Sequence, residues 1–491
     1  MTNHYGDGVA HLNIARKVVD SPDDSLWQRY IQIGTPWLPL HTVLMLPLVA
    51  NDWMWRTGVA GSIVSMVSFV VAAVALFLLA KSFYRKEDGP LKEFLPLISV
   101  AIFLLNPSAL YMQSTPMTES VFMAALVVAV WTLRRWVEDK TARRLIVAAL
   151  AMLAATLSRY EAWPVAAASV MLVALAPRGD LKARVKETVI FAAIVAAGPL
   201  YWLWHNWAIY GNAFEFLSGS HSARGLFHQN EANLGWAKIF VGHPFVDLLL
   251  MTVTAAVCVG PFLMMLGATG LGRALFVRRR ALFEDSAALL LLVPFFFHAL
   301  SLYRGEIQIL PLSAFGLHNV RYGLPHLLAV ALFAPSCALF FKSKARRLAI
   351  IAVCSIIALQ YGYLISEGPS QIAVYQEGFR NGVNARPARE RARVSSWLRE
   401  NPAKAMILMN TGALGPVVSG GGLRYSEIIH EGTLRWHEFN DHIPEDVSTI
   451  IIQEGDPLDE RIGGNARLSR DLEERFQKEL SVGKISVFRR K

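Results

Sequence analysis

Ten long apolar runs constrain the fold of this chain more than any other feature. A helix needs about 20 mostly apolar residues to cross the hydrocarbon core of a bilayer. Only 18 % of the residues are charged, whereas a soluble domain usually has about 25 %. The runs therefore predict about ten membrane-spanning helices, at approximately 57–80, 94–111, 118–134, 143–158, 161–176, 187–208, 247–271, 285–303, 323–341 and 347–366.

The polar connections between these runs differ in their basic residues. Alternate connections carry 21 lysines and arginines, and the intervening ones carry 5. Because basic residues stay on the cytoplasmic side of spanning helices, the first set is predicted to be cytoplasmic. The net charge of +10 is then a topology signal, and nucleic acid is not an expected partner. The basic set comprises 81–93, 134–144, 177–186, 273–284 and 342–347.

The remaining segments divide the chain into three predicted parts. Residues 1–56 form an exoplasmic juxtamembrane loop with a short amphipathic helix in the membrane plane, and 57–366 form the transmembrane bundle. Residues 367–491 are more polar and form a small exoplasmic soluble α/β domain. Its expected strands are 405–409, 449–453 and 485–489, and its expected helices are 392–399 and 468–480. The predicted fold class is an all-α polytopic membrane protein with this α/β domain.

The first candidate site lies near the N-terminus, at Asp7 and His11. Val9, Leu12 and Ala15 recur at helical spacing, so a helix is expected to begin near Gly8. Asp7 would cap that helix, or it would act as a general base at the membrane surface with His11 beside it one turn later.

A second acidic residue, Glu119, follows Thr115 and Thr118 at the start of an apolar run. A carboxylate at this depth is costly unless it faces a polar cavity. Alternatively, the two threonines and the glutamate form a capping box at the helix N-terminus. The sequence favours the polar cavity only modestly.

Two further motifs place arginines on the side where basic residues are scarce. Arg159 and Glu161 flank Tyr160 in a short turn, where a local ion pair is the simpler interpretation. Arg321 and Tyr322 lie at the mouth of a later run. A guanidinium there suits a phosphate, which it binds through two hydrogen bonds. It could equally be an interfacial arginine that extends to water.

No metal site can be assigned from spacing. His221, His228 and Glu231 share one polar segment but match no defined site. The three cysteines lie in apolar runs and indicate no disulfide or zinc site. A divalent metal is left open, and no nucleotide is expected because the glycine-rich stretch 412–422 lacks the Gly-Lys-Ser/Thr ending of a phosphate loop.

These motifs together resemble the GT-C membrane glycosyltransferases, and within them the branch near the protein O-mannosyltransferases and lipid A aminoarabinose transferases. Asp7 in Gly-Asp-Gly-Val-Ala-His matches the essential acidic residue of the family's first exoplasmic loop. The run 33–41 is similar to the following juxtamembrane segment, Glu119 to the acidic residue that opens a later span, and 319–322 to a late basic motif.

The sequence also departs from the family pattern. The family usually has a transmembrane helix before the Asp7 position and often a second adjacent carboxylate, where this chain has Gly8. Either a short N-terminal tail is translocated or such a helix precedes Met1. No Trp-Trp-Asp motif is found, so transfer to an asparagine side chain is not expected.

The resemblance implies an inverting transfer of a sugar from a polyprenyl-phosphate donor to an exoplasmic acceptor at the plasma (inner) membrane. Asp7 would be the base, and Arg321 with Arg159 would stabilise the leaving phosphate. Glu119, Glu161, His11 and Tyr322 would position the substrates. Two rivals stay open: a transporter or flippase, and a membrane scaffold whose C-terminal domain is the working part. Sugar and acceptor identity, metal dependence and oligomeric state cannot be read from the sequence.

Overall fold

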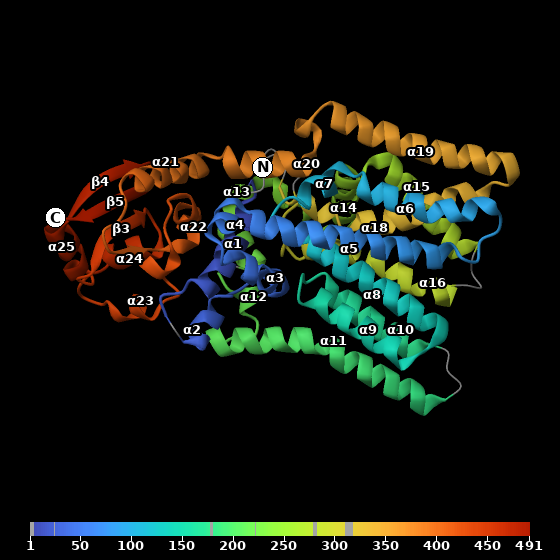
Figure 1. Ribbon diagram of the computed structural model, residues 1–491, viewed down its shortest axis with the longest axis horizontal. Helices are drawn as coiled ribbons and strands as arrows, with labels where there is room; N and C mark the ends of the chain where they lie inside the picture. The colour runs from blue at the N-terminus through green and yellow to red at the C-terminus, as the bar shows by residue number, and fades with distance from the viewer. Residues whose placement is uncertain (1–3, 24, 177–179, 221, 278–281, 310–317) are drawn as a thin grey trace.

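The computed structural model describes residues 4–23, 25–176, 180–220, 222–277, 282–309 and 318–491. Figure 1 shows an elongated molecule with a helical bundle at one end and a small sheet at the other. The N-terminal helices lie between them: α1 (Gly6–Val19), α2 (Leu26–Ile31), α3 (Leu40–Val49) and α4 (Asp52–Thr57).

Six helices in the described part of the chain are long and apolar enough to cross a membrane. They are α5 (Val59–Tyr84), α8 (Glu119–Asp139), α11 (Leu181–Tyr210), α19 (Ser343–Ser366), and two composite spans, Asp285–Tyr303 and Val320–Phe340. The last contains η5 (Val320–Gly323), α18 (His326–Phe333) and η6 (Ala334–Phe340). The protein is therefore an integral, multi-pass membrane protein, as the composition predicts.

A further pair of apolar helices counts as a seventh span if the two are taken together. Helices α14 (Pro244–Val259) and α15 (Pro261–Phe276) meet at an angle of 112°. Gly260 lies between them with φ +105°, a conformation that other residues rarely adopt. Pro261 then starts α15, where its missing N–H costs no helical hydrogen bond.

The other three predicted spans are helical but shorter. They correspond to α6 (Leu95–Leu104) with α7 (Pro107–Met112), to α9 (Ala142–Thr156) and to α10 (Ala162–Leu175). All ten predicted runs are thus helical, while six or seven meet the length of a single spanning helix in the described residues.

Helix α1 packs between α3 and the C-terminal domain. Its residues Leu12 and Ala15 are buried in one cluster with Met45 of α3 and Val417 of the C-terminal domain. The apolar face of α1 therefore packs against α3 and the C-terminal domain, and the place of this helix in the plane of the membrane surface stays a prediction.

The C-terminal domain contains a five-stranded sheet in the order β2-β1-β3-β5-β4. Strand β1 (Met406–Met409) runs parallel to β2 (Ile428–Ile429) and β3 (Val447–Gln453). Strand β5 (Ile485–Arg490) is antiparallel to β3 and to β4 (Phe476–Val482). The helices around the sheet are α21 (Arg386–Glu400), α22 (Thr411–Gly420), α23 (Leu434–Glu438), α24 (Pro457–Gly463) and α25 (Ala466–Arg475).

One predicted helix of this domain is partly wrong. The expected helix 468–480 ends at Arg475, and the residues from Phe476 form β4. Gly483, at φ +58°, makes the turn from β4 to β5. The hairpin pairs Phe476 with Arg490, and this pairing outweighs the local helical preference of the charged segment.

Ion pairs also connect the N-terminal helices α1 and α4 to the C-terminal domain. Lys17 lies 3.1 Å from Glu431 of the C-terminal domain, whose other carboxylate oxygen accepts a 2.8 Å hydrogen bond from the Thr411 amide. Arg16 pairs with Asp52 of α4 at 2.7 Å, and Asp52 in turn pairs with Arg424 at 3.0 Å. The domain is thus attached to the N-terminal helices by ion pairs as well as by apolar contacts.

We expect Glu431→Gln to lower the thermal midpoint by a few degrees at neutral pH. Burial raises the pKa of Glu431, but Lys17, His430 and Thr411 outweigh it and lower the pKa to about 2. A depressed carboxyl pKa stabilises the fold above its unfolded value of about 4.3, and that contribution is lost as the pH falls toward the folded value. One third of the side chain is exposed, so solvent reduces the effect.

The measurement is thermal unfolding in detergent micelles at several pH values. The wild-type and Glu431→Gln curves should converge between pH 5 and pH 2. A constant difference across that range would contradict the role assigned to this carboxylate.

Candidate functional site

Six charged residues from five segments meet where the bundle faces the N-terminal helices, and we call them the charged cluster. Asp7 lies in the first turn of α1, Glu119 begins α8, and Arg321 belongs to η5. Arg159 and Glu161 lie between α9 and α10, and Glu377 belongs to α20 (Ala373–Gly378). Five of the six were predicted from the sequence.

Arg321 is at the centre of the cluster. Its Nη2 lies 2.6 Å from Asp7 Oδ2, its Nη1 lies 2.9 Å from Glu377 Oε1, and its Nε lies 3.3 Å from Glu119 Oε1. The residue is only 8 % exposed. It is therefore a buried cation held by three carboxylates, and it does not extend to water at the membrane surface.

Arg159 shares Glu119 with Arg321 and adds the fourth carboxylate, Glu161. Its Nη1 lies 2.9 Å from Glu119 Oε1, and its Nε donates a 2.8 Å hydrogen bond to Glu161 Oε1. The predicted local ion pair therefore exists, but it is one link of a longer chain. Burial tends to lower the pKa of the Arg159 guanidinium, and Glu161 and Glu119 outweigh burial and raise that pKa.

The capping interpretations of the two acidic residues are not supported. Tyr5 is the N-cap of α1, and Asp7 directs its side chain to Arg321. Thr118 is the N-cap of α8 and makes no side-chain capping bond, while Glu119 is fully buried beneath the two arginines. Glu119 Oε2 has no hydrogen-bond partner.

Aromatic rings cover the two guanidinium groups. The Arg159 guanidinium lies 5.2 Å from the ring centre of Tyr322, and that of Arg321 lies 5.5 Å from the same ring. His298 stacks on Tyr322 at 5.0 Å, and its Nε2 lies 3.0 Å from Glu161 Oε1. Tyr322 thus lies beside both arginines, where cation–π attraction helps to hold them.

His11 lies close to the cluster without joining it. Its ring is 4.5 Å from that of Trp37 and 5.4 Å from that of His41, and no hydrogen bond to Asp7 is found. Burial lowers the pKa of His11 well below its usual value, and His41 and the two arginines add to this effect. The imidazole is therefore neutral at physiological pH, which suits positioning better than charge stabilisation.

Glu377 is the functional residue that the sequence analysis missed. It accepts hydrogen bonds from the Asn319 amide at 2.7 Å and from the Tyr5 hydroxyl at 3.3 Å, besides its pair with Arg321. Burial raises the pKa of Glu377, with Arg321 and the Asn319 amide opposing that rise. It follows the last apolar run, so neither a boundary position nor a motif distinguishes it in the sequence.

Close backbone packing brings α20 to this place. A Cβ atom on Gly378 would lie 2.9 Å from the Tyr5 ring, and one on Gly382 would lie 1.5 Å from the His4 carbonyl oxygen. Figure 1 shows α20 next to the N-terminus. The absence of side chains at these two positions lets the segment after α19 contact the residues that precede Asp7.

The cluster carries more negative than positive charge, with four carboxylates and two guanidinium groups. Among the described residues, no group of three or more His, Cys, Asp or Glu side chains is arranged to hold a metal ion. Of the segment considered for metal binding, His221 and the side chain of Glu231 lie outside the described residues.

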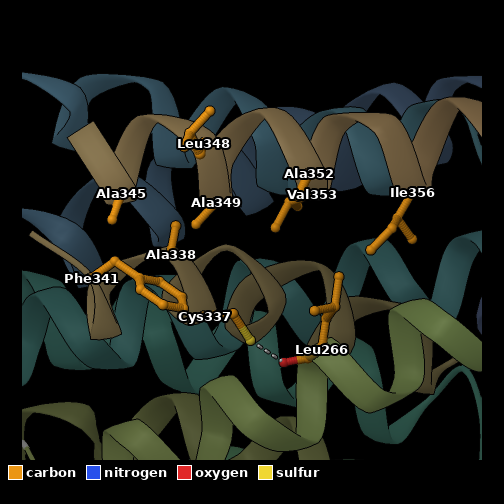
Figure 2. A pocket seen from close by; sticks show the side chains of 10 residues that line it. All are labelled: Leu266, Cys337, Ala338, Phe341, Ala345, Leu348, Ala349, Ala352, Val353 and Ile356. Carbon is orange, nitrogen blue, oxygen red and sulfur yellow. Dashed lines mark hydrogen bonds between the residues drawn. The ribbon is translucent and has the colours of Figure 1, made fainter. Parts of the chain in front are cut away.

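An apolar groove elsewhere in the bundle has a different character. It has a volume of about 460 Å³ and lies between the first half of α19 and η6 (Figure 2). Its one polar group, the Cys337 thiol, donates a hydrogen bond to the Leu266 carbonyl. Since Glu377 follows the opposite end of α19, this groove is separate from the charged cluster.

Comparison with known proteins gives matches among solved structures only. No protein-family model and no curated protein sequence matches the chain. One similar structure is an Archaeoglobus fulgidus oligosaccharyltransferase tethered with an acceptor peptide, at 12 % identity and a TM-score of 0.49, covering 97 % of this chain and 68 % of that one.

Two others are ArnT from Cupriavidus metallidurans. The apo form matches at 12 % identity and a TM-score of 0.49, covering 99 % of this chain and 94 % of that one. The form bound to undecaprenyl phosphate matches at 12 % identity and a TM-score of 0.48, covering 92 % and 87 %. The similar structures are GT-C glycosyltransferases.

We expect Arg159→Met to reduce the free energy of unfolding by roughly 3–5 kcal/mol, because it leaves buried carboxylates without this cation. Denaturant unfolding in detergent measures the change. Arg304→Met is the matched control, since Arg304 is 60 % exposed and pairs only loosely with Glu306; it should cost at most about 1 kcal/mol. Equal losses in the two variants would contradict a buried network at Arg159.

Proposed function

We propose that this protein is an inverting glycosyltransferase that moves a sugar from a polyprenyl-phosphate donor to an acceptor on the exoplasmic side of the plasma membrane. The observation that carries the proposal is the exposure of Asp7. Its side chain is 42 % exposed, whereas those of Arg321 and Glu119 behind it are 10 % and 0 % exposed. A substrate can reach this carboxylate while the buried charges hold it in place.

In the proposed reaction, Asp7 accepts the proton of an acceptor hydroxyl as that oxygen attacks the anomeric carbon of the donor sugar. The bond between the anomeric carbon and the phosphate oxygen breaks, and polyprenyl phosphate leaves with the electron pair. Arg321 and Arg159 stabilise the phosphate charge. His11, Glu119, Glu161 and Tyr322 position the substrates and the two arginines.

The pairing of Arg321 with Asp7 implies that the donor binds before the proton is transferred. Its Nη2 is bound to Asp7 before any substrate arrives. A donor phosphate that approaches this nitrogen competes with Asp7 for the guanidinium charge, because both groups are anionic. Donor binding therefore loosens Asp7 and makes it a better proton acceptor.

Topology supports the side of the membrane assigned here. Glu119 begins α8, whereas Arg134 and Arg135 of a basic connection lie near its other end. The charged cluster thus lies at the end of the bundle away from the basic connections, which the positive-inside rule assigns to the cytoplasm.

A transporter remains the second candidate because of the broken span. The 112° bend at Gly260 resembles the interrupted helices that form substrate sites in transporters. Such proteins usually carry a matching pair of broken helices, and the described residues contain one bent pair. Counterflow of substrate without covalent transfer would support this candidate.

We expect Asp7→Asn to reduce sugar transfer by at least about 100-fold, the usual scale for losing a general base. The assay supplies purified membranes with a panel of labelled polyprenyl-phosphate sugars and follows label into an acceptor. Glu367→Gln, an exposed carboxylate beyond α19, is the matched control and should transfer as the wild type does. An Asp7→Asn protein with full activity would exclude the mechanism.

We expect Glu377→Gln to slow transfer by about tenfold, mainly through kcat, because it leaves Arg321 free to bind Asp7 more tightly. One tenfold step corresponds to about 1.4 kcal/mol in the transition state. Glu377→Asp, which keeps the charge, should recover part of the loss, and Glu367→Gln again serves as control. A pure stability defect would lower the amount of active protein and leave kcat per folded molecule unchanged.

A further inference from the structure

A second pocket lies at the opposite end of the bundle from the charged cluster. It has a volume of about 370 Å³ and is formed by the end of α5, by η1 (Pro90–Phe94), by the start of α6 and by the second half of α8. Glu119 and Arg135 lie 16 positions apart on α8, which corresponds to about 24 Å along the helix axis. The pocket is therefore independent of the proposed reaction site.

Positive charge converges on this pocket from three elements. Its lining includes Lys81, Arg85, Lys92 and Arg135, together with one exposed carboxylate, Glu93. Three of these cations belong to the connection 81–93, and the fourth, Arg135, comes from α8, so two segments far apart in the sequence supply the charge.

Two of these four cations, Arg85 and Arg135, are already paired with a carboxylate of the protein. Glu138 lies 2.9 Å from Arg135 and 3.4 Å from Arg85, and it accepts a 2.7 Å hydrogen bond from Ser82. Lys81 and Lys92 make no ion pair in the part of the chain that the structure describes. The pocket thus keeps two ammonium groups available for an anion.

Apolar surface lies directly beside these cations. Leu78, Pro96 and Trp131 line the same pocket. Phe94 and Leu97, which follow the lining residues Glu93 and Pro96 in the sequence, are 53 % and 54 % exposed, as expected for side chains that face lipid tails. A ligand that fits here carries an anionic head next to hydrocarbon, and a tryptophan at this level is typical of the membrane interface.

We propose that this pocket binds the phosphate-bearing headgroup of an anionic membrane phospholipid, with Lys81 and Lys92 as its main charge contacts. Basic pockets between membrane helices on the cytoplasmic side are a known mode of anionic lipid recognition. The bound lipid fills the space between α5, α6 and α8, so its binding stabilises the packing of these helices against one another.

The test compares thermal midpoints of the purified full-length protein in detergent with added phosphatidylglycerol or phosphatidylcholine. Phosphatidylglycerol should raise the wild-type midpoint, and phosphatidylcholine should not. In the double variant Lys81→Gln/Lys92→Gln, the phosphatidylglycerol concentration needed for the same rise should increase about tenfold or more, because each cation near a lipid phosphate contributes to binding.

The control is Lys342→Gln/Lys344→Gln, an exposed basic pair in another connection of the predicted cytoplasmic side. It should respond to phosphatidylglycerol as the wild type does. An equal loss in both double variants would show a diffuse charge effect and overturn the proposal. An equal rise with inorganic phosphate would show a free-anion site and also overturn it. Both variants should match the wild type in phosphatidylcholine, which excludes misfolding.

Discussion

The arrangement of the whole N-terminal face depends on one guanidinium group. Arg321 joins α1, α8 and α20 through Asp7, Glu119 and Glu377. A buried arginine without these partners would be strongly destabilising, and so would the carboxylates without the arginine. Each element is therefore fixed by the charge of the others, and a second arginine, Arg159, extends the same network to the turn between α9 and α10.

This network also explains what the exposed carboxylate can do. Asp7 is anchored on one side by a buried cation and open on the other to solvent. Such a group is oriented before a substrate arrives. Since the cluster has more carboxylates than guanidinium groups, an anionic donor must compete for the arginines, and binding and activation of Asp7 become coupled.

Much of the helical bundle and of the charged cluster could be predicted from the sequence. Apolar length reveals spanning helices, and all ten runs are helical. Glu119 was predicted because a carboxylate at a membrane boundary is costly. Arg159 and Arg321 were predicted because basic residues are scarce on that side, and Asp7 from its match to the acidic residue of the family's first exoplasmic loop. Glu377 was missed because it lies in a polar segment where a carboxylate costs nothing until tertiary packing buries it. The strand from Phe476 was wrongly predicted as helix, because its extended form depends on pairing with β5 in the same hairpin and not on the residues of the segment alone.

Helix α1 has a consequence for how the molecule can move. Asp7 lies at one end of this rigid rod, and Lys17, bound to Glu431 of the C-terminal domain, lies near the other. The chain after α19 forms a second strut, because Gly378 and Gly382 rest on the residues just before α1. Because α1 and the chain after α19 are attached to the C-terminal domain at different points, the domain does not rotate about a single hinge. Asp7 and the ion pair to the C-terminal domain therefore lie on one helix, so a displacement of that domain would also move the segment that carries the Asp7 carboxylate.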